Sequence, residues 1–253
     1  MGTLNHRVRI LNGEFDPLTL EQTVRAVFDW MLTGRRGWVS TVNVSILMAM
    51  RSDRMLQSYV DRSAIVVADG QPLVWYGRLS NARLPERVTG IDLIDGLCRR
   101  AAERNIAVFA LGGTDSVLER ALLALRDRHP GLRITGLSGH YPESAAASRV
   151  AAINASGAHL LLVGMGSPRQ ERFIETHWES LRVAAAVGVG GSFDVIAGAR
   201  VRAPRWLRRM GLEWLVRLAQ EPRRLFVRYA ASNSRFCVLS MRELAKRLRQ
   251  SGR

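Results

Sequence analysis

Three polar residues of the sequence lie at the ends of short β-rich runs, and their types suit hydrogen bonding or acid–base chemistry. Asp69 comes after AIVVA in the segment ADGQP, and Thr41 and Asn43 lie in STVN. Asp-Gly is a common turn, and threonine and asparagine are common turn or cap residues. However, a carboxylate at the carboxyl end of a parallel strand lies where α/β enzymes hold catalytic groups. Asp69 is therefore also a candidate general base.

The segment GMGSPRQE, residues 164–171, follows the apolar run HLLLV and begins a predicted helix. Its Ser-Pro pair predicts an N-cap and a first helical position, and Gln170 completes a capping box, so a stable helix start explains the segment without a ligand. Alternatively, Gly164 and Gly166 let an anion such as a diphosphate approach the N–H groups of the helix N-terminus, with Arg169 beside it. On these residues alone the two interpretations stay open.

Two further segments could contribute to the same site. ERVTG supplies Arg87, which is either an exposed arginine or a bidentate clamp for phosphate. VGVGGSFD, residues 187–194, is either a tight turn capped by Asp194 or a loop that lines the pocket. The sequence contains none of the common catalytic motifs HExxH, CxxC, Walker A and GxSxG. It also lacks an Asp-x-Asp pair and the third glycine of a dinucleotide-binding fingerprint. The sequence therefore predicts no metal and no cofactor.

Alternating apolar runs and helical patterns must position these residues. Unbroken apolar runs that end in glycine are typical of strands buried on both faces of a parallel sheet. They predict an α/β fold, a Rossmann-like, doubly wound and mostly parallel sheet, over residues 1–202. The predicted strands are 38–43, 64–68, 107–113, 133–139, 159–166 and 183–191, and the predicted helices lie near 19–33, 45–58, 90–104, 115–128, 143–156 and 168–180.

The C-terminal part of the chain, residues 203–253, has a different pattern. Two amphipathic helices, near 205–220 and 223–249, predict a basic helical appendage. Residues 200–253 supply +12 of the net charge of +15. This asymmetry indicates a polyanionic partner, either a membrane surface or nucleic acid. No apolar run approaches the roughly 18 residues of a membrane-spanning helix, so contact with a membrane is expected to be peripheral.

Eight motifs, taken in their order along the chain, resemble those of the bacterial WecG/TagA/CpsF family, glycosyltransferase family 26. They are TVN, ADG, ERVTG, LGG, GMGSPRQE, GVGGSFDVIAG, RAP and GLEWLVRLAQEPRRLFVRY. The resemblance extends from about residue 39 to 229. It implies an inverting enzyme that moves a hexose or N-acetylhexosamine from a UDP-sugar to a polyprenyl-diphosphate-linked saccharide. It also implies a peripheral protein at the cytoplasmic face of the inner membrane. Exopolysaccharide synthesis is the role that we expect, and homo-oligomers are left open.

The resemblance also implies roles for individual residues. Asp69 would be the general base on the acceptor hydroxyl, with Thr41 and Asn43 beside it. Arg87 and Gln170 would help to bind the acceptor or the donor diphosphate. Arginines and helix N-termini would stabilise the departing UDP. Three arginines of the tail are candidates to close over the site, namely Arg217, Arg224 and Arg228.

The aromatic and basic side chains of the tail also predict how the protein meets a membrane. Tryptophan and arginine suit the interface of an anionic bilayer, and the predicted docking residues are Trp206, Arg208, Arg209 and Trp214. In the alternative interpretation, Trp214 packs back on the body or on another subunit.

Other functions would also explain parts of the sequence. A nucleic-acid-binding protein or a non-catalytic membrane-surface protein would explain the basic tail, but neither needs the ADG or PRQE motif. A nucleotide-dependent oxidoreductase fits the fold class but lacks the fingerprint. We therefore expect a UDP-sugar, a lipid-linked acceptor and an anionic membrane surface as partners, and no nucleic acid.

Overall fold

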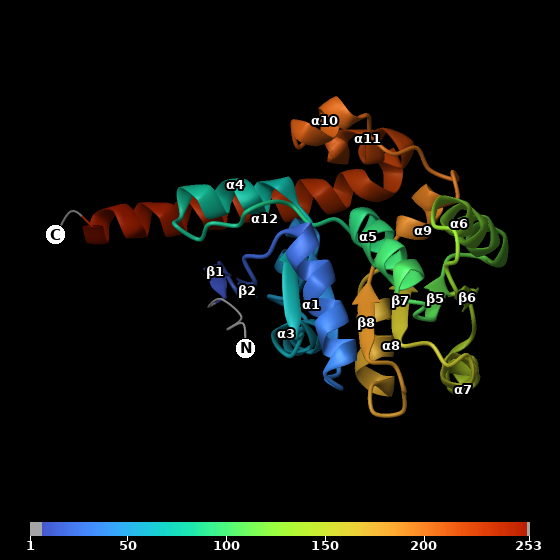
Figure 1. The fold of residues 1–253 in the computed structure, drawn as a ribbon. Helices are drawn as coiled ribbons and strands as arrows, with labels where there is room; N and C mark the ends of the chain where they lie inside the picture. The colour runs from blue at the N-terminus through green and yellow to red at the C-terminus, as the bar shows by residue number, and fades with distance from the viewer. Residues whose placement is uncertain (1–6, 252–253) are drawn as a thin grey trace.

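A six-stranded parallel sheet forms the centre of the protein (Figure 1). The structure, a computed structural model, describes the backbone of residues 7–251. Within this range it leaves undescribed the side chains of Arg205, Arg209, Arg217, Arg224, Leu225, Val227, Arg228, Arg247, Leu248, Gln250 and Ser251.

All six predicted strands are confirmed, and so is the α/β fold. The sheet order is β4-β3-β8-β7-β5-β6, and every pairing is parallel. The strands are β3 (Gly37–Val42), β4 (Ile65–Ala68), β5 (Val108–Gly112), β6 (Ile134–Leu137), β7 (Leu160–Gly164) and β8 (Ala185–Gly188). Because β3 leads to β4 on one side while the next strands lie on the other, the sheet is doubly wound, and its ligands are expected at the carboxyl ends of the strands.

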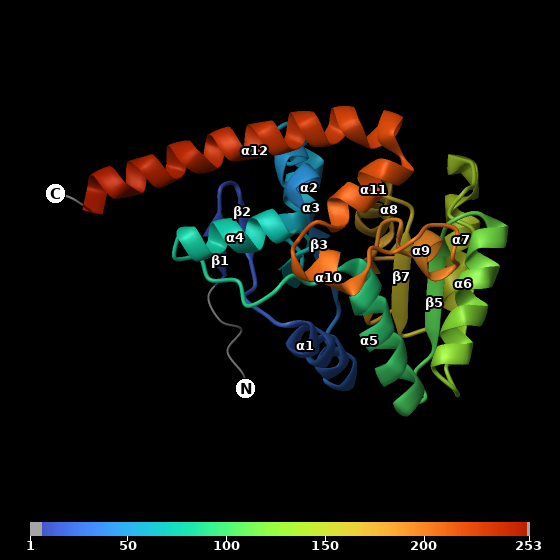
Figure 2. The same cartoon turned by 90° about the horizontal axis from the view of Figure 1, so that it is seen from above.

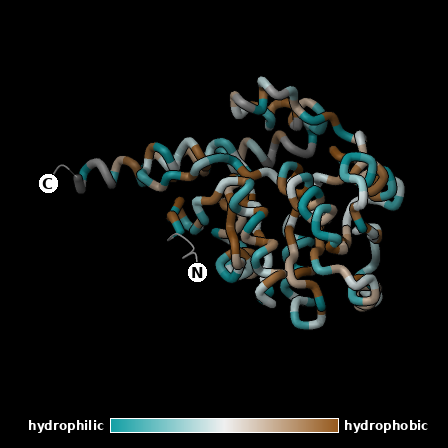
Figure 3. Tube along the Cα trace, viewed as in Figure 1, coloured by the Kyte–Doolittle hydropathy of each residue, from teal (hydrophilic) through white to brown (hydrophobic). Residues whose placement is uncertain are grey.

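Helices cover both faces of the sheet. One face packs against α1 (Leu20–Leu32), α5 (Gly90–Glu103) and α6 (Asp115–Arg128). The other packs against α2 (Val44–Ala49), α3 (Arg54–Asp61), α7 (Ala146–Ala155) and α8 (Arg169–His177). Figure 3 shows hydrophobic residues concentrated on the strands between these layers.

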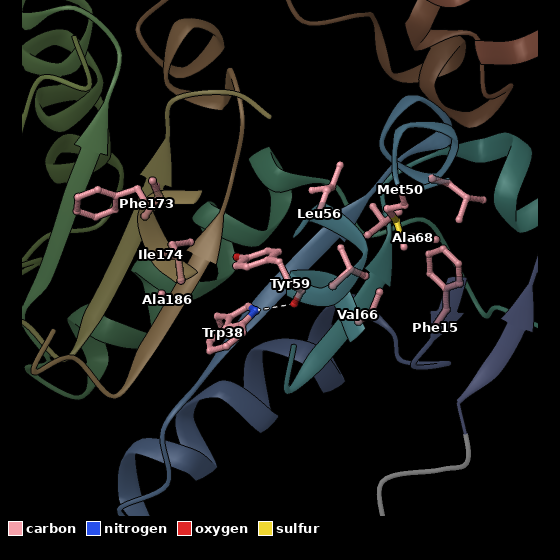
Figure 4. Packing of buried hydrophobic residues seen from close by; sticks show 14 of the residues in the cluster. Phe15, Trp38, Met50, Leu56, Tyr59, Val66, Ala68, Phe173, Ile174 and Ala186 are labelled. Carbon is pink, nitrogen blue, oxygen red and sulfur yellow. Dashed lines mark hydrogen bonds between the residues drawn. The ribbon is translucent and has the colours of Figure 1, made fainter. Parts of the chain in front are cut away.

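The second of these packed faces has an aromatic centre (Figure 4). The rings of Trp38 and Tyr59 stack with their centroids 5.4 Å apart, and the Trp38 indole Nε1–H donates to the Tyr59 carbonyl oxygen at 3.1 Å. Phe173 and Ile174 of α8 are buried in the same cluster. This packing fixes α3 and α8 against the sheet, and with them the loops that precede both helices.

Several elements differ from the predicted pattern. The helix predicted over 45–58 is two helices, because the Asp53 carboxylate accepts the Leu56 N–H at 3.1 Å and caps a new helix, α3. The sequence also did not reveal a hairpin of β1 (Val8–Ile10) and β2 (Gly13–Phe15), the helix α4 (Gln71–Leu79), or the short helix α9 (Ser192–Ile196).

The tail contains three helices where two were predicted: α10 (Arg205–Arg209), α11 (Glu213–Gln220) and α12 (Pro222–Ser251). The break lies at Gly211, whose φ of +73° favours glycine. A Cβ at this position would lie 2.4 Å from Cγ of Gln71. Among residues 7–251, no helix combines the length and the apolarity that crossing a membrane requires.

The tail also packs into the body. Helix α12 crosses α2, and Figure 2 shows its C-terminal part extending beyond the rest of the molecule. Phe236 of α12 is only 5% exposed and contacts Tyr76 of α4 edge to face, with ring centroids 5.9 Å apart. The boundary between a domain of residues 1–202 and an appendage of residues 203–253 stays a prediction.

Candidate active site

A cavity of about 590 Å³ lies at the carboxyl edge of the sheet. All six strands contribute to its wall through the residues at or just beyond their carboxyl ends. In strand order from β3 to β8, these are Asn43, Asp69, Gly113, Gly139, Gly164 and Gly190. Four of the six are glycines, so that part of the wall presents backbone groups to a ligand.

Asp69, Thr41 and Asn43 come together in this cavity, as the sequence predicts. The Asp69 N–H donates to the Val42 carbonyl oxygen at 2.9 Å, which ties the end of β4 to the end of β3. The Thr41 hydroxyl donates to the Gly188 carbonyl oxygen at 2.9 Å, and the Asn43 side chain caps α2. Thr41 and Asn43 therefore stabilise the wall around Asp69 as well as lining it.

Gln170 does not form the predicted capping box. Helix α8 begins at Arg169, and its N-cap residue makes no side-chain hydrogen bond. The Gln170 side chain is instead buried, and its Oε1 accepts the Gly190 N–H at 2.9 Å. It occupies the space that a Cβ on Gly188 would need, since that atom would lie 2.8 Å from Gln170 Nε2. Gln170 therefore joins the loops after β7 and β8 and lines the cavity between them.

The other residues of the GMGSPRQE segment separate into two groups. Gly164 and Gly166 line the cavity. A Cβ on Gly164 would come within 2.5 Å of the Phe193 ring, so packing alone explains this glycine. Arg169, in contrast, is exposed, and its guanidinium donates to the Tyr141 carbonyl oxygen at 2.9 Å and lies over the Tyr141 ring. The structure does not bring Arg169 together with the residues that line the cavity.

Arg87 lines a smaller cavity of about 110 Å³ that shares Asp69 with the larger one. Its guanidinium lies 2.9 Å from the carboxylate of Glu213, the first residue of α11. Gln71 of α4 and Trp214 of α11 also line this smaller cavity. Asp69 therefore lies where the two cavities meet, with an arginine on the side of the smaller one.

The tail forms part of the cavity wall. The Gln220 amide makes two hydrogen bonds with the backbone of Val201, at 3.0 and 2.9 Å, and Glu221 forms an ion pair with Arg200 at 2.9 Å. Gln220, Glu221 and Arg200 all line the larger cavity. Sequence reasoning missed Arg200, and its position just after GVGGSFDVIAG is the one signal that could have indicated it. Arg217, Arg224 and Arg228 belong to α11 and α12, but their side chains lie outside the described ones.

Comparison with known proteins identifies the family. Residues 8–250 match the model of the glycosyl transferase WecG/TagA/CpsF family. The chain belongs to this family. It is 32% identical over 186 residues to a Bacillus subtilis (strain 168) protein, covering 73% of this chain and 72% of the relative. It is 30% identical over 221 residues to a Staphylococcus aureus (strain MW2) protein, covering 87% of each. Both relatives are named N-acetylglucosaminyldiphosphoundecaprenol N-acetyl-β-D-mannosaminyltransferase.

This WecG/TagA/CpsF-family protein is therefore a glycosyltransferase, and the predicted enzyme class is confirmed. The assignment replaces the alternatives of an oxidoreductase and of a non-catalytic protein. The side chains described between residues 7 and 251 include no group of three His, Cys, Asp or Glu placed to hold a metal ion.

The predicted docking residues of the glycosyltransferase differ in exposure. Trp206 is 61% exposed, and Trp214 is 38% exposed with its ring edge against Tyr229. Since Tyr229 belongs to α12, this contact lies within the tail, and both interpretations of Trp214 stay predictions. Arg208 is half-buried, and the Arg209 side chain lies outside the described ones.

Glu171 is a buried carboxyl that sequence reasoning missed. It follows Gln170 on α8, and its Oε1 accepts the Gln170 amide at 3.0 Å. Burial raises its pKa above the ordinary value of 4.5. Since the charged form is disfavoured in the folded protein, the native state is expected to lose stability as the pH rises from 4.5 through the raised pKa.

The variant Glu171→Gln is therefore expected to raise the free energy of unfolding more at mildly alkaline pH than at pH 4.5. The amide keeps an oxygen acceptor for Gln170 but cannot ionise. Urea denaturation at both pH values measures the difference, with the exposed Glu179→Gln as the control. A variant whose stability relative to the unaltered chain stays the same at both pH values would contradict the expectation.

Proposed function

We propose that the enzyme transfers a hexose or N-acetylhexosamine from a UDP-sugar to a polyprenyl-diphosphate-linked saccharide, with inversion at the anomeric carbon. The observation that carries the proposal is the position of Asp69 at the junction of two cavities. The names of the relatives, which specify a diphosphoundecaprenol-linked acceptor sugar, support the same kind of acceptor here.

In this proposal the larger cavity holds the donor and the smaller one leads the acceptor to Asp69. The acceptor hydroxyl gives its proton to the Asp69 carboxylate while its oxygen forms a bond to the anomeric carbon. The bond from that carbon to the UDP oxygen breaks on the opposite face, so the configuration inverts and UDP leaves. Asp69 is the catalytic residue, and Thr41, Asn43 and Gln170 shape its surroundings.

Charge that develops on the departing diphosphate needs donors placed in advance. Arg200 and the glycine-rich loops containing Gly164 and Gly166 line the donor cavity, and their guanidinium and N–H groups suit this role. Arg87 suits the diphosphate of the acceptor. The tail arginines Arg217, Arg224 and Arg228 would add to the donor site from α11 and α12.

We further propose that the enzyme docks on the cytoplasmic face of the inner membrane and serves in exopolysaccharide synthesis. The tail side chains Trp206, Arg208, Arg209 and Trp214 would hold it there as a peripheral protein. Each basic residue near an anionic surface contributes about 1 kcal/mol. The exposure of both tryptophans supports this role.

The first experiment measures the release of UDP with a panel of UDP-sugars and polyprenyl-diphosphate-linked mono- or disaccharides. We expect turnover with one donor, and no change on adding EDTA, because the site as described relies on arginines and backbone N–H groups. UDP-N-acetylmannosamine is the first donor to try, since the relatives are named for that sugar. The absence of UDP release with every pair, in detergent and with membranes, would contradict the proposed reaction.

A further inference from the structure

Helix α4 has two different faces, and the reaction proposed above uses neither. Leu73, Val74 and Tyr76 are buried in the core. On the opposite face Trp75 is 44% exposed, Leu79 is 72% exposed, and Arg78 lies between them. The spacing of i, i+3 and i+4 puts these three side chains on one stripe of the helix. An exposed stripe of this kind marks an interaction site when it joins other apolar surface.

The exposed stripe meets the tail at Trp75. A Cβ on Gly211, in the turn between α10 and α11, would lie 2.9 Å from Cζ2 of Trp75. Figure 2 shows α10 next to one end of α4, and in Figure 1 α4, α10 and α11 all lie on the side toward which the arrowheads of β7 and β8 point. The large apolar side chains that these helices leave exposed are Trp75, Leu79, Trp206, Met210, Trp214 and Leu215.

The charged residues around these side chains are mostly basic, and the acidic Glu213 next to Trp214 is paired with Arg87. Residues 71–85 contain two arginines and no acidic residue, and residues 200–212 contain five arginines and no acidic residue. Tryptophan, methionine and arginine are enriched both in protein–protein interfaces and at membrane interfaces, so residue types alone do not identify the occupant. The surplus of positive charge does, because a second copy of this chain would carry the same charge, whereas an anionic bilayer carries the opposite one.

We infer that α4 forms one docking face with α10 and α11, defined by Trp75, Arg78, Leu79, Trp206 and Trp214, and that this face lies on an anionic lipid bilayer. The inference deepens the proposed function and rests on it, because a lipid-linked acceptor must reach Asp69 from a bilayer. The smaller cavity opens beside this face, since Gln71 of α4 and Trp214 of α11 line it together with Asp69 and Arg87. A diphosphate held at Arg87 can therefore keep its prenyl chain in the bilayer next to α4.

Sedimentation with acceptor-free vesicles tests the docking face. The vesicles contain phosphatidylglycerol and phosphatidylethanolamine in equal parts, and vesicles of phosphatidylcholine serve for comparison. The double variant Trp75→Gln/Leu79→Gln is expected to lower the partition coefficient on anionic vesicles by on the order of tenfold or more, because two apolar side chains lose their burial in lipid. The matched control Leu32→Gln/Leu123→Gln changes two exposed leucines on α1 and α6 and should bind as the unaltered chain does.

Folding and self-association are checked on the same samples. Leu79→Gln alone alters a side chain that is 72% exposed, so it should keep the melting temperature and still weaken binding. Vesicle binding by the double variant equal to that of the unaltered chain would overturn the inference. If the unaltered chain does not bind vesicles but forms dimers that the double variant does not form, a second copy covers this face, and the inference is also overturned.

The experiment also separates this inference from the proposals it rests on. One result would support docking by the tail and overturn the role of α4. In that result Trp206→Gln/Trp214→Gln loses vesicle binding while the α4 variant Trp75→Gln/Leu79→Gln binds fully. The proposed reaction is tested separately through UDP release by the unaltered chain. Its failure there would leave the vesicle result standing as a measurement of docking alone.

Discussion

Replacing Asp69 by asparagine is expected to lower the rate of sugar transfer by a factor of about 10²–10⁴, the usual contribution of a positioned general base. The amide has nearly the shape of the carboxylate, but it cannot take the proton from the acceptor hydroxyl. Because Asp69 lies where the two cavities meet, the change leaves the walls formed by Thr41 and Gln170 in place. The effect should therefore appear in kcat, with the affinity for UDP nearly unchanged.

A matched carboxylate on the surface provides the control. Asp61 is exposed on α3 and accepts a hydrogen bond from Gln57, so Asp61→Asn makes the same chemical change away from both cavities. It should retain the activity of the unaltered enzyme. UDP binding is measured by calorimetry and transfer by UDP release. Retention by Asp69→Asn of more than a tenth of the transfer rate would remove Asp69 as the base.

Replacing Phe236 by alanine is expected to lower the free energy of unfolding by about 3–5 kcal/mol, as for other buried phenylalanines. Phe236 belongs to the tail by sequence, yet it is 5% exposed and packs on Tyr76 within the core of the body. The variant would leave a cavity between α12 and α4. Urea denaturation in the absence of lipid measures the loss.

Phe226 on the same helix is the control for this prediction. It is 63% exposed, so Phe226→Ala should change the free energy of unfolding by less than about 0.5 kcal/mol. A change as small for Phe236→Ala as for Phe226→Ala would contradict the contribution of Phe236 to the core. If instead the difference holds, deleting residues 203–253 would remove part of the core, and substitutions such as those in the docking face are the better test of membrane binding.

The strands and the position of the site could be predicted from sequence because their signals are local. A short apolar or β-rich run predicts a buried parallel strand, and polar residues at its end then lie at the carboxyl edge. Asp69, Thr41 and Asn43 followed from this rule. Helix α4 was not predicted, because this helix of nine residues contains both Pro72 and Gly77, and these two residue types weaken a helical sequence pattern.

The residues that were predicted wrongly or missed depend on partners far along the chain. Gln170 carries the local signature of a capping box, but its side chain binds Gly190, twenty residues later. Arg200 has no local signal beyond its position after GVGGSFDVIAG, and its closer ion-pair partner, Glu221, comes from the tail. The helix predicted over 205–220 is broken at Gly211 because α4 lies against the turn. Tertiary contacts override local propensity at each of these positions.

The order of strands in the sheet has a consequence for how the protein is made. β8 lies between β3 and β7, yet it is the last of the six strands in the chain. During synthesis, β3 with β4 and β5 with β6 and β7 can each pair as they leave the ribosome, but residue 188 must emerge before they can join. Until then the nascent chain carries unpaired edges on β3 and β7, which are templates for aggregation. A chain whose synthesis stops before that residue would contain two half-sheets, each with an edge open to another chain.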